Sequence, residues 1–386
     1  MKKILLLTSE SLNLKSGGGL ANKAFFDSLV LRYPDSVDVV QIAHSLTDVD
    51  HDNFYFVPEI SKAGQVLWLL RGRYHRLYQW MPSFLAKHGK EYSYCIMNAS
   101  TYADTIDMMS DYGIKTAVIH HNYEVRYQMD NRLPSTLFGF TPYMVERNER
   151  LALNKAELNM YLTEYDKETI ISKYNISSNL DKHVVVGMYE PRVVTDSFDN
   201  SDDLALNDKV LAICGSLSGL QTEQSVFDVF ENYYNIIAEL YSGDFKLIIA
   251  GRNPSEKMVA KCNMHENVVL KANPENMFKT IDKAGIFICP VNCGSGLKLR
   301  IMDGLKLGMP ILTHEVSARG YEQYRKFKWF QVYNDKQSFA TGLRNIVSLI
   351  ELNGNLRNEI KTEYNNYFSF ENGNRRFIKC IESFCK

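Results

Sequence analysis

Residues 289–312 read CPVNCGSGLKLRIMDGLKLGMPIL and place a glycine turn between an apolar run and a helical pattern. The apolar run Ile286–Pro290 predicts a buried strand, and the pattern after the turn predicts a helix over about 297–307. Ser295 or Gly296 would cap that helix. Its apolar positions recur at helical spacing: Leu297, Ile301 and Leu305. A strand, a glycine turn and a helix in this order are typical of parallel α/β sheets.

Two cations, Lys298 and Arg300, stand in the first turn of the predicted helix. Positive side chains near a helix N-terminus are disfavoured by about 0.3–1 kcal/mol each. A bound anion reverses this preference, because the turn amides, the positive helix end and both cations would hold a diphosphate. In the alternative interpretation the cations are solvated and the glycines only make a turn. Asp303 could accept hydrogen bonds from ribose hydroxyls, or it could simply be exposed.

Short apolar runs alternate with helix-like segments along the whole chain. This alternation predicts parallel sheets with helices on both faces. The predicted strands are Ile4–Thr8, Val37–Ile42, Tyr94–Met97, Thr116–His120, Leu158–Leu162, Val210–Cys214, Phe245–Ala250, Val268–Leu270, Ile286–Pro290 and Pro310–Thr313.

The polar, acidic stretch 187–208 has no clear period, and we interpret it as a linker between two domains. The domains would cover 1–190 and 206–368, with an amphipathic helix over 370–386 crossing back to the first. Ligands of open α/β sheets bind beyond the carboxyl ends of the strands. We therefore expect the two domains to face each other across a cleft, with a site built from strand-end loops of both.

Composition narrows the function classes. The chain has 386 residues, 45% of them hydrophobic, and a net charge of −1, which gives no reason to expect nucleic acid as a partner. Seven scattered cysteines without a C-x-x-C pair favour a reducing compartment. The first apolar run has about five residues, too few for a signal core, and no run approaches the ~18–20 residues of a membrane span. We expect a cytoplasmic protein.

The segments of the second half together resemble the donor domain of GT-B-fold glycosyltransferases of group 1, the family 4 class of nucleotide-sugar enzymes. Beside the stretch quoted above, the resemblance rests on AICGSLSG (212–219), LIIAGRNP (247–254), NVVLKANPENMFKTIDKAGIFICP (267–290) and THEVSARGYE (313–322), in that order. It implies an α/β protein of two doubly wound Rossmann-like domains. It also implies a nucleotide-diphosphate sugar as donor substrate, a retaining reaction, no cofactor and no metal.

The resemblance also implies roles for single residues. Lys298 and Arg300 would hold the donor diphosphate, Asp303 would stand for a glutamate that grips the ribose, and Gly215 and Ser216 would line the phosphates. Other implied donor contacts are Arg252, which could equally be a surface residue, the base-pocket candidates Leu270, Asn273 and Met277, and the turn residues Gly294, Ser295, Gly296 and Leu297.

Three positions depart from the class pattern. The loop of Ser216 lacks an arginine that many members carry, Ser295 replaces a sugar-contacting glutamate, and Asp303 is shorter than glutamate. These departures motivate a second hypothesis, a non-catalytic partner subunit that stabilises or guides an active transferase. An epimerase would need further carboxylates, and a dinucleotide oxidoreductase is disfavoured because no G-x-G-x-x-G follows the first strand.

The first half contributes two polar stretches. A turn over 16–19, with Gly17, Gly18 and Gly19, precedes a helix and would approach the donor phosphate. In TAVIHHNYEVRY (116–127) a strand delivers two histidines. By resemblance His121 faces the donor sugar, and Asn122 and Glu124 lie on the acceptor side. His120 is expected to be a structural histidine. Metal binding by the two histidines is disfavoured, because neighbouring residues of a strand point to opposite faces.

Residues 64–88, GQVLWLLRGRYHRLYQWMPSFLAKH, mix aromatic and basic side chains. Such a stretch either lies on an anionic membrane surface or covers a sheet. The first possibility would suit a lipid-linked acceptor at the inner face of a membrane. The expected acceptor is a glycan, a polysaccharide precursor or a lipid-linked sugar. Farther along, Thr163 is expected to cap a helix, with Asp166 three residues on.

Overall fold

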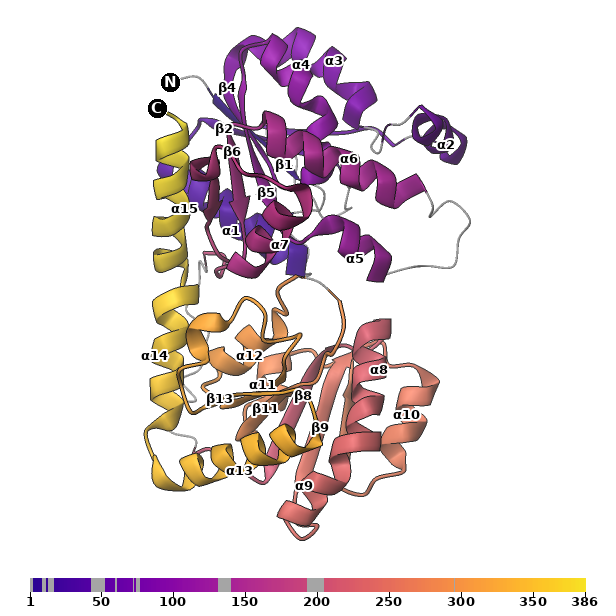
Figure 1. Ribbon diagram of the computed structural model, residues 1–386, viewed down its shortest axis with the longest axis vertical. Helices are drawn as coiled ribbons and strands as arrows, with labels where there is room; N and C mark the ends of the chain where they lie inside the picture. The colour runs from indigo at the N-terminus through magenta and orange to yellow at the C-terminus, as the bar shows by residue number, and fades with distance from the viewer. Residues whose placement is uncertain are drawn as a thin grey trace. The chain divides into compact units, whose positions relative to one another are not determined.

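The computed structural model describes residues 3–8, 12, 17–42, 53–59, 61–71, 73, 77–130, 140–192, 205–294 and 296–386. They form two compact units. Unit 1 comprises Met1–Val194 with Phe368–Lys386, and unit 2 comprises Thr195–Tyr367. Each unit is built around one sheet with helices packed on it (Figure 1).

Unit 1 has a parallel sheet in the order β3-β2-β1-β4-β5-β6-β7. Its strands are β1 (Lys3–Thr8), β2 (Val37–Gln41), β3 (Phe54–Phe56), β4 (Tyr92–Met97), β5 (Lys115–His120), β6 (Leu158–Tyr161) and β7 (His183–Val185). The strand order runs outward in both directions from β1 and β4. Ligands of doubly wound sheets bind beyond the strand ends at such a reversal.

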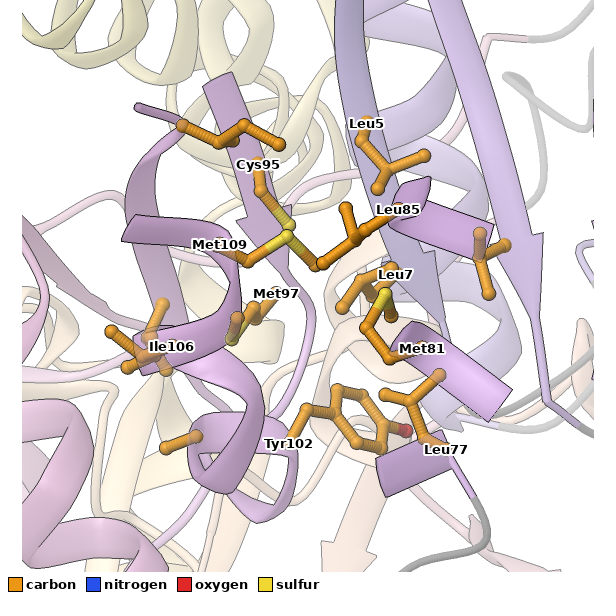
Figure 2. Close-up of a cluster of buried hydrophobic side chains, with 14 of the residues drawn as sticks. Leu5, Leu7, Leu77, Met81, Leu85, Cys95, Met97, Tyr102, Ile106 and Met109 are labelled. Carbon is orange, nitrogen blue, oxygen red and sulfur yellow. The ribbon is translucent and has the colours of Figure 1, made fainter. Parts of the chain in front are cut away.

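The helices of unit 1 are α1 (Gly17–Arg32), α2 (Lys62–Leu70), α3 (Leu77–His88), α4 (Ile106–Asp111), α5 (Glu124–Asp130), α6 (Phe140–Lys155), α7 (Glu164–Tyr174) and α15 (Phe370–Phe384). α3 buries Leu77, Met81 and Leu85 against the side chains of β1 and β4, as Figure 2 shows. α3 therefore covers the sheet, whereas α2 exposes Val66, Leu67 and Leu70.

The C-terminal helix α15 packs on unit 1. The rings of Phe25 in α1 and Phe377 in α15 lie 4.8 Å apart, and the Tyr94 hydroxyl donates a 2.6 Å hydrogen bond to the carbonyl oxygen of Cys385. Tyr189, which is fully buried, lies under Gly373 of this helix. The expected linker over 187–208 is therefore wrong at its beginning, because Tyr189 is a core residue of unit 1.

Unit 2 has a parallel sheet in the order β10-β9-β8-β11-β12-β13. Its strands are β8 (Val210–Ser216), β9 (Lys246–Arg252), β10 (Val268–Ala272), β11 (Ile286–Cys289), β12 (Ile311–His314) and β13 (Phe330–Tyr333). Its helices are α8 (Leu220–Asp228), α9 (Tyr234–Leu240), α10 (Glu256–Asn263), α11 (Met277–Ile281), α12 (Arg300–Lys306), α13 (Lys336–Leu352) and α14 (Leu356–Phe368). The reversal of strand order lies between β8 and β11.

The prediction of an α/β chain with two parallel sheets is confirmed, and each of the ten predicted strands is present. The Thr163 cap is also confirmed, because its hydroxyl oxygen accepts a 2.9 Å hydrogen bond from the amide of Asp166. Three short strands were missed, and each lies at the edge of a sheet: β3, β7 and β13. In the described part of the chain, every helix is too short or too polar to cross a bilayer.

Candidate functional site

The turn between β11 and α12 forms the centre of the candidate site in unit 2. Gly294 and Gly296 have positive φ angles of 89° and 73°, which a right-handed helix does not accept. The helix therefore begins at Arg300 rather than at about 297, and Gly296 does not cap it. Lys298 consequently precedes the helix, which corrects the prediction. Ser295 lies outside the described residues.

Arg300 makes the most informative contact of this turn. Its guanidinium group lies against the α-carbon of Gly215, where a Cβ would meet Nη1 at 2.7 Å and Cζ at 2.8 Å. Gly215 also has a φ of 148°, so both its backbone and its surroundings demand glycine. Nη2 donates a 3.1 Å hydrogen bond to the hydroxyl of Thr222 in α8.

The other nitrogen, Nη1 of Arg300, is buried and has no hydrogen-bond partner among the described residues. Leaving a buried donor unsatisfied costs about 1–3 kcal/mol, and more for a charged group. An anionic oxygen at Nη1 would remove that cost. The arrangement therefore favours an anion beside Gly215.

Helix α8 supports the glycine turn. The side chain of Gln221 covers Gly294, where a Cβ would lie 2.6 Å from Oε1. The hydroxyl oxygen of Ser225 accepts a 3.4 Å hydrogen bond from the amide of Asn292. Sequence reasoning missed these contributions of α8, although Gln221 and Thr222 each precede Ser225 by about one helical turn and all three are polar.

Lys298 and Asp303 complete the group around the turn. The backbone carbonyl oxygen of Lys298 accepts a 3.0 Å hydrogen bond from the buried Tyr321 hydroxyl, and the Lys298 side chain is partly buried. The thiol of Cys214 lies 3.8 Å from Asp303 Oδ2. Burial raises the pKa of Cys214 well above its ordinary value, so the thiol keeps its proton and donates to the carboxylate. Asp303 and Arg300 thus both approach the end of β8.

The remaining donor candidates occupy the neighbouring strand ends. Ser216 and Arg252 pair across β8 and β9, and both side chains are exposed. Asn273 follows edge strand β10, and its Oδ1 accepts a 2.8 Å hydrogen bond from the amide of Asn253, so the side chain shapes a turn. Leu270 packs against the core from β10. Met277 is the first residue of α11 and is partly buried, and Leu297 is partly buried in the turn before α12.

In unit 1 a chain of polar side chains links the ends of three strands. His121 directly follows β5, and its Nε2 lies 2.7 Å from Oδ1 of Asn98, which follows β4. Asn98 Nδ2 donates to Asn22 Oδ1 on α1, and Asn22 Nδ2 donates a 2.7 Å hydrogen bond to Thr8 Oγ1 at the end of β1. Burial lowers the pKa of His121 to about 4, so the ring is neutral at pH 7. Sequence reasoning had identified His121 but neither asparagine.

The other predicted residues of unit 1 lie close to His121. Asn122 donates a 3.2 Å hydrogen bond to Glu124 Oε1, and burial raises the pKa of Glu124 to about 7. The amide of Glu124 in turn donates to Oε1 of Glu149 at 2.8 Å. The sequence predicts a turn that contains Gly17, Gly18 and Gly19 before the helix. In the structure these three glycines are instead the first residues of α1.

His120 is a core residue, as expected. It is fully buried, its Nε2 lies 2.8 Å from Asn159 Oδ1, and its ring stacks on Tyr161 at 4.8 Å. Over the described ranges, no group of three or more His, Cys, Asp or Glu side chains is arranged to hold a metal ion.

Residues 208–348 match the family model of group 1 glycosyl transferases. No curated protein sequence matches the chain.

Among solved structures, HepE from Anabaena in complex with UDP superposes with a TM-score of 0.65 at 11% identity, over 99% of this chain and 100% of that one. A glycosyltransferase from Rickettsia africae gives 0.67 at 11% identity, over 100% and 99%. A UDP-forming α,α-trehalose-phosphate synthase from Burkholderia xenovorans gives 0.64 at 10% identity, over the full length of both chains. These structures are similar to this chain in fold.

The fold predicted from the resemblance is therefore confirmed, and the turn that carries Arg300 lies inside the matched segment. Residues 208–348 are similar to the group 1 glycosyl transferase family, and the chain as a whole has the GT-B fold of the glycosyltransferase structures that it superposes on.

Proposed function

We propose that this protein transfers a sugar from a nucleotide-diphosphate sugar to a hydroxyl acceptor. The observation that supports it best is the guanidinium group of Arg300, which Gly215 and Thr222 hold in place while Nη1 stays unpaired. A diphosphate oxygen would satisfy that donor. The HepE structures with UDP and with UDP-glucose add support, because HepE shares the fold.

The proposed chemistry is electrostatic. Arg300 and Lys298 would neutralise the negative charge that develops on the leaving diphosphate, and preorganised donors of this kind supply a large part of catalysis in many enzymes. The reaction would retain the configuration at the transferred carbon and need no metal, as the resemblance implies. The acceptor hydroxyl would pass its proton to a leaving phosphate oxygen. Asp303 would bind the ribose, and Leu270, Asn273 and Met277 would line the base.

Unit 1 would contribute the acceptor side. His121 would contact the donor sugar as a neutral ring, and Asn122 and Glu124 would face the acceptor. The proposed acceptor is a glycan, a polysaccharide precursor or a lipid-linked sugar.

We propose that the protein acts in the cytoplasm, at the inner face of a membrane. Of the two helices in 64–88, α2 offers large exposed apolar side chains for such a contact, whereas the large apolar side chains of α3 pack in the core. We therefore narrow the proposed membrane contact to α2.

A non-catalytic partner subunit is the second candidate. Ser216, where the class often has an arginine, is exposed and bonds to Ser218 at 3.3 Å, and Asp303 is engaged by the thiol of Cys214. Such a subunit would bind nucleotide weakly or not at all.

The test is a thermal-shift panel of nucleoside diphosphates and their sugars, followed by hydrolysis assays with each ligand that binds. We expect one nucleotide sugar to stabilise the wild-type protein and to be hydrolysed slowly. Lys298→Ala and Arg300→Ala should abolish both effects. Lys306→Ala, which removes another cation of α12, should change neither. If no nucleoside diphosphate and no nucleotide sugar stabilises the wild-type protein, the result would support the partner subunit instead.

A further inference from the structure

The hydrogen bonds around His121 assign a proton position to its ring. Asn98 Nδ2 is a donor to Asn22, so the atom of Asn98 that faces His121 is the carbonyl oxygen Oδ1. A carbonyl oxygen only accepts hydrogen bonds. The 2.7 Å contact therefore requires that His121 carries its proton on Nε2.

The two asparagines are held firmly enough to impose this choice. Both side chains are buried, with 2% of the surface exposed in each case. Asn22 Nδ2 donates onward to Thr8 Oγ1 at the end of β1, so an unbroken row of hydrogen bonds links the two asparagines to this strand end. The row of hydrogen bonds therefore runs from Thr8 through the two asparagines and ends at the imidazole ring of His121.

The other ring nitrogen, Nδ1, is left as an acceptor. Asn98 is the one side chain in the described part of the protein to which the His121 ring hydrogen-bonds. His121 is partly exposed, and its ring forms a T-shaped pair with the ring of Phe25, with the two centroids 6.4 Å apart. A neutral ring protonated on Nε2 presents a lone pair at Nδ1, which binds a donor such as an O–H group and repels a phosphate or carboxylate oxygen.

We propose that Asn98 and Asn22 are positioning residues that fix His121 in its Nε2–H tautomer, so that Nδ1 accepts a hydrogen bond from a substrate hydroxyl. This inference rests on the proposed function for the identity of the hydroxyl, a sugar hydroxyl. The tautomer itself does not depend on that function. In this proposal unit 1 recognises a hydroxyl group at His121, and unit 2 recognises an anion at Arg300.

The experiment measures the tautomer directly by long-range proton–nitrogen NMR of protein labelled with ¹⁵N-histidine, with His121→Gln used to assign the signal. We expect the wild-type ring at pH 7 to show a protonated Nε2 and an unprotonated Nδ1. Asn98→Leu should give a mixture of tautomers, and Asn98→Asp, which keeps an acceptor oxygen, should keep the proton on Nε2. Asn159→Leu is the matched control, because Asn159 bonds in the same way to the neighbouring His120; it should leave the His121 signal unchanged.

The functional readout is the kinetics of the nucleotide sugar found in the thermal-shift panel. Asn98→Leu should lower kcat/KM for that donor about tenfold, the value of one hydrogen bond to a sugar hydroxyl, while the affinity for the nucleoside diphosphate stays unchanged. A wild-type ring protonated on Nδ1, or an Asn98→Leu ring that keeps the wild-type tautomer, would overturn the inference. If the tautomer is as expected but no nucleotide sugar binds or reacts, the proposed function fails and the positioning role of the asparagines stands.

Discussion

The guanidinium group of Arg300 lies against the α-carbon of Gly215, so close that a methyl group there would meet Nη1 at 2.7 Å. The two residues are 85 positions apart and come from α12 and from the end of β8. The first prediction concerns this contact. Gly215→Ala should push the guanidinium group away and weaken nucleoside diphosphate binding roughly ten- to hundredfold, the value of one charge-assisted hydrogen bond.

The control for this variant separates backbone strain from the contact. Gly243 also has a positive φ, of 83°, but a methyl group at its α-carbon would have nothing within 4 Å. Gly243→Ala should therefore lower the melting temperature without changing nucleotide affinity. Equal affinities in wild type and Gly215→Ala, measured by isothermal titration calorimetry, would show that the Arg300 position is irrelevant to binding.

Thr222 is predicted to act through Arg300. Thr222→Val keeps the shape of the side chain but removes the acceptor for Nη2, and we expect about tenfold weaker nucleotide binding. Thr222→Ser should restore it. Thr362→Val changes another helical threonine, whose hydroxyl bonds only within its own helix, and should have no effect.

A double-mutant cycle makes this prediction specific. In the Arg300→Ala background, Thr222→Val should cost nothing further, because the partner of the hydroxyl is gone. Additive losses in the double variant would indicate that Thr222 acts by another route.

Glu149 should make the stability of unit 1 depend on pH. It is fully buried, and its carboxylate accepts hydrogen bonds from the amide of Glu124 and, at 2.5 Å, from the Tyr174 hydroxyl. Burial nevertheless raises the pKa of Glu149 from 4.5 to about 8. The folded state therefore holds a proton that the unfolded state releases, and the free energy of unfolding should fall as the pH rises from about 4.5 to about 8.

Glu149→Gln removes this titration. We expect the melting temperature of the variant to fall less steeply than that of the wild type between pH 5 and pH 8, by several degrees over the interval. Glu157→Gln, at an exposed position, should keep the wild-type slope. If the melting temperatures of wild type and Glu149→Gln change equally with pH, Glu149 does not hold a proton in the folded state. Glu124, whose pKa is raised to about 7, should add a second, smaller contribution of the same sign.

Helix α2 is predicted to bind anionic lipid. Leu67 and Leu70 are 47% and 76% exposed, and no acidic residue occurs between Glu59 and Glu91 in the sequence. Inserting two leucines while lysines and arginines meet lipid phosphates favours binding. Leu67→Glu/Leu70→Glu should lower co-sedimentation with phosphatidylglycerol vesicles roughly tenfold or more, since burial of each leucine contributes about 1.5–3 kcal/mol.

The control is Leu180→Glu, which changes a leucine of unit 1 that is 53% exposed but lies far from α2 in the sequence. It should bind vesicles as the wild type does. Vesicles of phosphatidylcholine alone should bind all variants weakly. If the wild-type protein does not bind anionic vesicles, the prediction that α2 binds anionic lipid is wrong.

The sequence predicts the central strands well because they are continuous apolar runs buried on both faces. It fails at the edges, where Phe54–Phe56 and Phe330–Tyr333 are short and aromatic. It also misplaces the start of α12, because the apolar spacing from Leu297 onward continues a helical pattern that the positive φ of Gly296 forbids.

Some residues of the candidate site can be predicted from the sequence, and others cannot. Arg300, Gly215 and His121 could be identified from local motifs and their resemblance to a family. Thr222, Asn22 and Asn98 could not, because each acts through a partner at least 23 residues away in the sequence. Such partners meet only once the strands are paired. The structure therefore adds the residues that hold the predicted ones in place.

The central claim is that Arg300 holds the diphosphate of a nucleotide sugar. Its most direct test is the dissociation constant of the nucleoside diphosphates, UDP first, for wild type, Arg300→Ala and Lys306→Ala by isothermal titration calorimetry. We predict that the wild type and Lys306→Ala bind one of them with equal affinity and that Arg300→Ala binds it about a hundredfold more weakly. Equal affinity in all three proteins, or no binding by the wild type, would contradict the claim.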